Sequence, residues 1–187
     1  MLNGINLLNL GCGQEIFEGW VNADFFKGFI PWRKYTWKPD WMLDLRYPLR
    51  CDDNLFDGVF CEHTIEHLYP QEVSQLLRET LRVMKPGAWL RISVPDLEKY
   101  VNFYAGEGTL ENFTSRWATG CEAIRSLTQN WLHYSVWDYT LLERFLREAG
   151  FSQIRKVGFM EGSDAHLLRD SEERRWESLY MEAQKKI

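Results

Sequence analysis

Apolar and polar positions along this chain alternate between two periods, one typical of strands and one typical of helices. Five segments have the length and composition of short buried strands: residues 5–10, 20–24, 41–45, 56–61 and 88–94. Residues 151–159 and 178–185 read as two further strands. The pattern therefore predicts a sheet built from strands spread over the whole chain.

Two helical patterns lie between these strands. From residue 71 onward, apolar side chains recur at the spacing of one helix face, and Pro86-Gly87 is expected to end this helix. A second helix is expected at Thr140, which forms a capping box with Glu143, and Gly150 is expected to cap its end. Strands that alternate with helical crossovers predict an α/β domain with a mainly parallel sheet, which binds its ligand beyond the carboxyl ends of the strands.

The length of the chain indicates that residues 1–187 form one domain of this kind. Two stretches, about residues 26–41 and 99–137, interrupt the regular alternation and are expected to be insertions. Asp24 lies only 11 positions after Gly13, against about 20 after the glycine motif of a standard nucleotide-binding unit. The first crossover helix is therefore expected to be short or absent.

Composition limits the partners and the compartment. A formal charge of −5 and a pI near 5.5 argue against bulk nucleic acid, which normally requires a basic face. No apolar run approaches the roughly 20 residues of a membrane helix. The four cysteines form no C-x-x-C pair, and no secretory signal opens the chain, so we expect reduced thiols and a cytoplasmic location.

The segment CEHTIEHLYP, residues 61–70, contains the spacing of a zinc site. His63, Glu66 and His67 spell H-x-x-E-H, which on a helix places two imidazoles one turn apart. Pro70 disfavours helical conformation at the residue before it, so little helix can form here. The short helix disfavours a catalytic metal here, and the same residues could instead form a loop at a cofactor site, which the motif resemblance described below favours.

A glycine turn follows the first predicted strand. Gly11 and Gly13 allow positive φ and a close approach of the backbone to a ligand, while Asp24, at the end of the next strand, can accept hydrogen bonds from ribose hydroxyls. A simple turn between two strands explains the glycine pair equally well when it is taken alone. The neighbouring motifs decide between these interpretations.

Taken in order, the motifs resemble those of class I S-adenosylmethionine-dependent methyltransferases, and within them the small type-11 group. They are LNLGCG at residues 8–13, Asp24, the pair Asp44-Leu45, NLFD at 54–57, EHL at 66–68 and LRVMKPG at 81–87. The resemblance is strong over about residues 5–100. It implies a Rossmann-like three-layer sandwich with a seven-stranded, mainly parallel sheet and an antiparallel last strand.

The resemblance also implies the cofactor, S-adenosyl-L-methionine, and its product S-adenosyl-L-homocysteine. It assigns cofactor contacts to eight residues: Gly11, Cys12, Gly13, Asp24, Asp44, Leu45, Glu62 and His63. Asp44 and Leu45 would contact the adenine edge, and the segment after the fourth strand would face the methionine end. Asn9 stands where an acidic residue is more common in the family, which is expected to weaken one contact near the cofactor.

The acceptor side is expected in the insertion after the fifth strand. His133 lies there within NWLHY, residues 130–134, and it competes with His63 for the role of general base. Trp117, Tyr134 and Trp137 would line the pocket or pack against the sheet. Residues 172–175, EERR, read as a charged surface. We expect methyl transfer to a small-molecule or glycan acceptor, on oxygen.

Two other classes of function remain open at this point. A dinucleotide-dependent oxidoreductase would require a third glycine where Ile16 stands, and residues 1–26 contain no Lys or Arg for a diphosphate. A non-catalytic module that keeps the cofactor as a structural ligand is the other alternative. Because the chain starts almost at its first strand, the open cofactor side is expected to be covered either by the insertions or by another subunit, as a homodimer or with a partner subunit.

Overall fold

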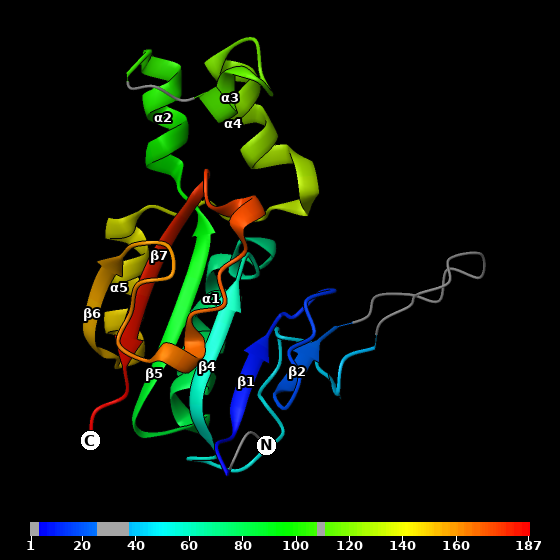
Figure 1. Cartoon of the computed structure of the whole chain (residues 1–187), viewed down its shortest axis with the longest axis vertical. Helices are drawn as coiled ribbons and strands as arrows, with labels where there is room; N and C mark the ends of the chain where they lie inside the picture. Colours follow the sequence, from blue (N-terminus) through cyan, green and yellow to red (C-terminus); the bar gives the residue numbers. More distant parts are fainter. Residues whose placement is uncertain (1–3, 26–37, 108–110) are drawn as a thin grey trace.

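The computed structural model describes residues 4–25, 38–107 and 111–187. A seven-stranded sheet crosses the molecule in the order β3-β2-β1-β4-β5-β7-β6 (Figure 1). The strands are β1 (Leu7–Leu10), β2 (Val21–Asp24), β3 (Trp41–Met42), β4 (Phe56–Glu62), β5 (Met84–Pro95), β6 (Ser152–Val157) and β7 (Ser178–Gln184).

The pairing of the strands confirms the predicted sheet. Strands β1 to β5 pair in parallel, whereas β7 pairs antiparallel with both β5 and β6. The carboxyl ends of β1, β2, β4 and β5 therefore share one edge, and in Figure 1 their arrowheads point to the upper part of the view. This edge is where a parallel sheet binds its ligand.

One face of the sheet packs against helices α1 (Pro70–Val83) and α5 (Tyr139–Ala149). Alternate strand residues such as Leu8, Val59 and Ile92 form this core with the apolar stripes of the two helices. Burial of these stripes supplies most of the driving force for the packing.

The opposite face is covered by loops and short turns in the described part of the chain. The 3-10 turn η3 (Ala165–Leu167) brings Leu167 onto Leu7 and Phe60. Beside it, the guanidinium of Arg91 is buried against the carboxylate of Asp170, and a buried ion pair of this kind must be fully hydrogen-bonded to be tolerated. The segment between β6 and β7 thus provides much of the third layer.

The first crossover contains no helix, as its length predicted. Two buried amides hold it instead. Asn9 donates to the carbonyl of Glu15 at 2.7 Å, and Asn22 accepts from the N–H of Phe17 at 2.9 Å and donates to its carbonyl at 3.0 Å. The amide of Asn9 is therefore committed to the crossover, where it satisfies backbone groups that a helix would have paired.

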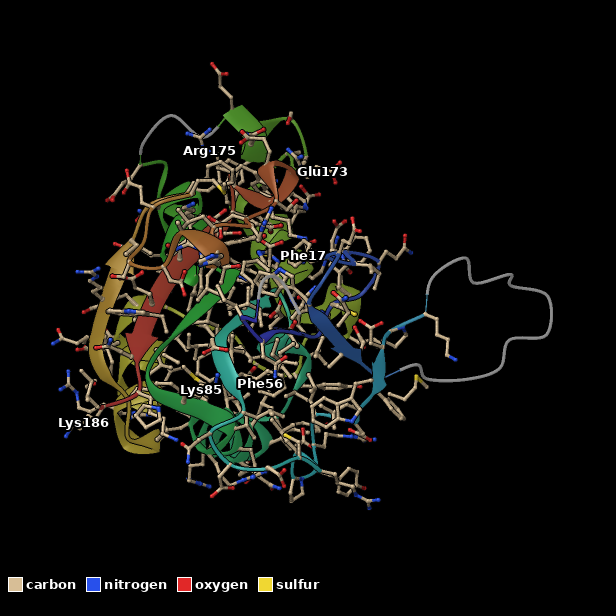
Figure 2. The ribbon with its side chains drawn as sticks, turned by 60° about the horizontal axis from the view of Figure 1, so that its bottom comes forward. Phe17, Phe56, Lys85, Glu173, Arg175 and Lys186 are labelled. Carbon is tan, nitrogen blue, oxygen red and sulfur yellow. The ribbon has the colours of Figure 1, made fainter. Side chains whose placement is uncertain are left out.

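A helical cap lies beyond the carboxyl ends of the strands (Figure 1). It consists of α2 (Leu97–Ala105), α3 (Glu111–Thr114), α4 (Gly120–Gln129) and the turn η2 (Asn130–Leu132). Figure 2 shows Glu173 and Arg175 near this cap, and Phe56 and Lys85 at the other end of the sheet. The turn η4 (Glu172–Arg174) therefore brings the segment before β7 to the same end as the cap.

The structure corrects two helix boundaries. Helix α1 ends at Val83, so Pro86-Gly87 lies inside β5 and does not end the helix. The cap of α5 is Asp138, whose carboxylate accepts from the N–H of Leu141 at 2.7 Å, and Thr140 is already inside the helix. None of the helices in the described residues is long and apolar enough to cross a membrane.

Candidate functional site

A cavity of about 770 Å³ opens at the carboxyl edge of the sheet. Its walls come from the segments that follow β1, β2, β3 and β4. All eight residues predicted to contact the cofactor line it: Gly11, Cys12, Gly13, Asp24, Asp44, Leu45, Glu62 and His63. Residues that are distant in the sequence meet here because neighbouring parallel strands end at the same edge.

The two glycines of the turn at the base of this cavity are needed for different reasons. Gly11 has φ of 75°, and a Cβ there would lie 2.2 Å from the Oγ1 of Thr64. Gly13 has φ of 50°, and a Cβ there would meet nothing within 4 Å. The first glycine makes room for a side chain from the loop after β4, whereas the second leaves its side of the turn open.

Asp24 fixes the same turn from the end of β2. Its carboxylate accepts from the N–H of Gly13 at 2.6 Å and from the N–H of Phe25 at 2.5 Å. Burial raises the pKa of Asp24, although these two hydrogen bonds oppose the shift. A carboxylate oxygen offers more than one lone pair, so the group can still accept hydrogen bonds from ligand hydroxyls.

Asp44 and Glu62 place two more carboxylates on the cavity wall. Asp44 pairs with the guanidinium of Arg46 at 2.6 Å. Glu62 accepts from the N–H of Ser171 at 3.1 Å, and burial raises the pKa of its carboxyl. With Asp24, these groups make the wall rich in acidic side chains, which suits a cationic ligand.

His63 is held in an unusual backbone conformation at the end of β4, with φ of 45°. A non-glycine residue with positive φ is strained, and such strain is often found at functional sites. The hydroxyl of Ser178 donates to the carbonyl of Arg174, so it accepts from the Nε2–H of His63 at 2.6 Å. The free lone pair of this imidazole is therefore on Nδ1, and burial lowers the pKa of His63 well below 6.5.

The H-x-x-E-H segment does not form an α-helix. Residues Ile65–His67 make a single 3-10 turn, and α1 begins only at Pro70. The geometry of a zinc helix, with two imidazoles one α-helical turn apart, is therefore not formed. The side chain of Glu66 points inward and is 1% exposed, and burial raises the pKa of its carboxyl to about 8.

A second cavity of about 520 Å³ lies under the helical cap. It shares four wall residues with the first cavity: His63, His67, Trp131 and Arg174. Aromatic rings of Tyr100, Trp117 and Trp176 provide much of its remaining wall, together with His133. The two cavities therefore adjoin at the end of β4.

The other aromatic residues of this region differ in where their rings lie. Tyr134 lines the first cavity, whereas Trp137 is buried in the core beside Phe145 and is not part of either wall. Trp131 is 77% exposed and has φ of 65°, so it presents its ring to solvent from a strained position.

Arg174 is the functional candidate that the sequence pattern missed. It belongs to the EERR run that predicted a charged surface, yet it lines both cavities, while its neighbours in the run are exposed. Its side chain forms no ion pair or hydrogen bond with another described residue. No local signal separates it from Arg175, because only the path of the segment before β7 turns it inward.

Comparison with known proteins shows which proteins the chain resembles. Residues 34–92 match the family model described as a methyltransferase domain. The chain is similar to the structure of a SAM-dependent methyltransferase from Archaeoglobus fulgidus, with 20% identity, a TM-score of 0.61, and coverage of 97% of this chain and 86% of the other. No curated protein matches the sequence.

Two other solved structures are similar over nearly the whole chain. One is the complex between the Haloferax volcanii Trm112 methyltransferase activator and the protein assigned as its methyltransferase, with 15% identity, a TM-score of 0.55 and 98% and 84% coverage. The other is Haemonchus contortus phosphoethanolamine N-methyltransferase 2 in complex with S-adenosyl-L-methionine, with 16% identity, a TM-score of 0.56 and 98% and 49% coverage.

The fold and the matched segment resemble those of class I S-adenosylmethionine-dependent methyltransferases. S-adenosylmethionine is the cofactor of this class, and one of the similar structures holds it.

Proposed function

We propose that this protein transfers a methyl group from S-adenosylmethionine to an oxygen of a small-molecule or glycan acceptor. The observation that carries the proposal is the contact between two cavities, one lined by the whole predicted cofactor set and one lined by aromatic rings under the helical cap. Such an arrangement suits a donor in one cavity and an acceptor in the other, with the methyl group at their junction.

The cofactor would be held by groups that suit each of its parts. Gly11, Cys12 and Gly13 bring the backbone close to the ligand, and Asp24 accepts hydrogen bonds from the ribose hydroxyls. Asp44 and Leu45 lie where the adenine edge would be. Glu62 and His63 would face the methionine end, where the carboxylate of Glu62 favours the sulfonium charge.

The acceptor would lie in the second cavity, within the single domain formed by residues 1–187. The insertion at about residues 99–137 contains most of the helical cap and would form the acceptor side, whereas most of the 26–41 insertion lies outside the described residues. Trp117 and Trp176 offer flat apolar faces that suit a sugar or another small ring. The net charge of −5 does not favour bulk nucleic acid as the acceptor.

The reaction is an in-line displacement. The acceptor oxygen attacks the methyl carbon, the bond from that carbon to sulfur breaks, and S-adenosylhomocysteine leaves with the bonding electron pair. The hydroxyl proton passes to an imidazole. His63 and His133 are the candidates, because both line the acceptor cavity and each has one ring nitrogen held by a hydrogen bond, which leaves the other lone pair free.

The proposal also extends to the cellular compartment and to a partner subunit. The four cysteines are free, which suits the reducing cytoplasm. A homodimer contact or a partner subunit would cover the cofactor cavity, whose rim carries the exposed rings of Phe25, Tyr69 and Tyr134. The similar Haloferax volcanii complex contains an activator subunit, which supports a partner in this role.

Calorimetry with S-adenosylmethionine tests the cofactor site. Asp24→Ala removes a buried hydrogen-bonding carboxylate, which is expected to cost about 1.5–3 kcal/mol, or roughly ten- to a hundredfold in affinity. Asp52→Ala removes an exposed carboxylate that lies outside both cavities and should bind like the wild type. Equal affinity of Asp24→Ala and the wild type would remove Asp24 from the site.

Radiolabelled methyl transfer to a panel of hydroxylated small molecules and oligosaccharides tests the activity. With an acceptor found, loss of the general base by His63→Gln or His133→Gln should lower kcat by about 10²–10⁴-fold. The affinity for S-adenosylhomocysteine should stay near the wild-type value in His133→Gln, because His133 does not line the cofactor cavity. A protein that binds the cofactor and methylates no acceptor in the panel would instead be a non-catalytic module.

A further inference from the structure

We infer that Glu66, His67 and His133 form a binding site for one divalent transition-metal ion, with Zn²⁺ as the best match. Each of the three side chains offers one ligand atom, and these atoms all lie within 4.8 Å of one another. Two imidazoles and one carboxylate are a ligand set that Zn²⁺ takes in proteins, and three protein ligands leave a position open for a further ligand.

The carboxylate of Glu66 lacks a hydrogen-bond partner in its described surroundings, where the Nδ1 of His63 approaches one oxygen only to 3.6 Å. Both oxygens are buried, and neither has a hydrogen-bond partner among the described residues. Leaving a buried polar group without a partner is costly, and native structures rarely do so without a reason such as a ligand or an ion. A metal ion beside these oxygens would supply the missing partner.

The two imidazoles are oriented as metal ligands are. The Nδ1 of His133 lies 2.7 Å from the carbonyl oxygen of Leu127, and the Nδ1 of His67 lies 3.4 Å from that of Leu132. Donation by Nδ1 to a carbonyl leaves the lone pair on Nε2, and this outer hydrogen bond is the usual way in which proteins fix a ligating histidine. The rings meet edge to face, with centroids 4.9 Å apart.

The place of the site in the fold allows an ion to enter and to meet a substrate. His67 is exposed, and all three residues line the second cavity, so the open position would face the proposed acceptor. The Nδ1 of His63 lies 3.6 Å from an oxygen of Glu66 but outside the three-residue set. Ligation occupies the lone pair of His133, so in the metal-bound protein His63 is left to take the acceptor proton.

This site differs from the zinc helix that the H-x-x-E-H spacing suggested. The third ligand comes from the segment after α4, which only the folded chain brings to the turn at residues 65–67. The sequence-based expectation of no metal rested on the resemblance to methyltransferases and on the short helix available before Pro70. The inference concerns metal binding, and its test requires neither S-adenosylmethionine nor an acceptor.

The test uses the whole protein, stripped of metal with a chelator and titrated with Zn²⁺ against a chromophoric competitor. We expect one ion per chain and little competition from Mg²⁺, which prefers an all-oxygen shell. His67→Ala and His133→Ala should each weaken binding by more than the roughly 10–100-fold that loss of a supporting second-shell group causes. Glu66→Gln, which keeps the shape of the side chain, should do the same.

Two controls separate this site from others. His166→Ala removes an exposed imidazole that pairs with Asp164 elsewhere on the surface, and His63→Ala removes the neighbouring imidazole outside the ligand set; both should keep one ion per chain. Co²⁺ should give the visible absorption of a four-coordinate site in the wild type and lose it in His67→Ala. Absence of zinc binding in the stripped wild type, or binding unchanged by His67→Ala and His133→Ala, would overturn the inference.

Discussion

Replacing each of the two glycines of the turn after β1 by alanine should lower the free energy of unfolding by different amounts and for different reasons. Both have positive φ, 75° at Gly11 and 50° at Gly13. A Cβ at Gly11 would also lie 2.2 Å, 2.3 Å and 2.8 Å from the Oγ1, Cγ2 and Cβ of Thr64, whereas a Cβ at Gly13 would meet nothing within 4 Å. The pair therefore separates backbone strain from steric overlap within a single turn.

The magnitudes follow from these two terms. The left-handed conformation costs a residue with a Cβ about 1–2 kcal/mol, and both variants carry this cost. Overlap in a packed site adds about 1–3 kcal/mol in Gly11→Ala alone. We therefore expect the free energy of unfolding to fall by about 1–2 kcal/mol in Gly13→Ala and by about 2–5 kcal/mol in Gly11→Ala.

Urea unfolding followed by tryptophan fluorescence measures both changes, provided that the slope of the transition stays the same. Thr64→Gly provides the matched background, because it removes all three atoms that the new Cβ would meet. In that background the cost of Gly11→Ala should fall to that of Gly13→Ala. Equal losses in the two single variants, or a cost of Gly11→Ala that Thr64→Gly leaves unchanged, would refute the steric argument.

Two further predictions concern the helices that flank the sheet. Asp138→Ala should lower the free energy of unfolding by about 0.5–2 kcal/mol through loss of the α5 cap, whereas Thr140→Ala, inside the helix, should stay within about 0.5 kcal/mol; the reverse order in urea unfolding would restore Thr140 as the cap. Hydrogen bonds from Arg82, and from the N–H of Leu49, lower the pKa of Glu79 below its ordinary value of 4.5. The ionised carboxylate therefore stabilises the protein above that ordinary pKa, and the contribution is lost as the pH falls through the lower folded value. The urea midpoints of the wild type and Glu79→Gln should thus differ at neutral pH and begin to converge only as the pH falls below about 4.5, becoming equal below the lower folded pKa; a gap that persists in stronger acid would contradict the assignment.

The residues that line the first cavity could be predicted to lie together because they follow neighbouring strands. Gly13, Asp24 and Glu62 each stand at the end of an apolar run, and parallel pairing brings such ends together. The sheet could be predicted from the same apolar runs, because a short apolar segment bounded by turn residues is typical of a buried strand in an α/β pattern.

The features that escaped prediction depend on the path of the chain in three dimensions. Arg174 turns inward because the segment between β6 and β7 crosses the sheet, and its charged neighbours conceal this in the sequence. The meeting of Glu66 with His133 requires the fold of the cap. Asp138 and Thr140 are both good caps by residue type, so only the backbone conformation distinguishes them.

The position of β7 has a consequence for synthesis of the protein. Strand β7 is made after β6 but lies between β5 and β6, and it provides every strand contact of β6. During translation the parallel strands β1 to β5 can pair as they emerge, whereas β6 must wait for β7 with an unpaired strand edge. The growing chain is therefore expected to pass through a stage in which the edge of β5 is exposed, and it leaves that stage only when β7 is inserted.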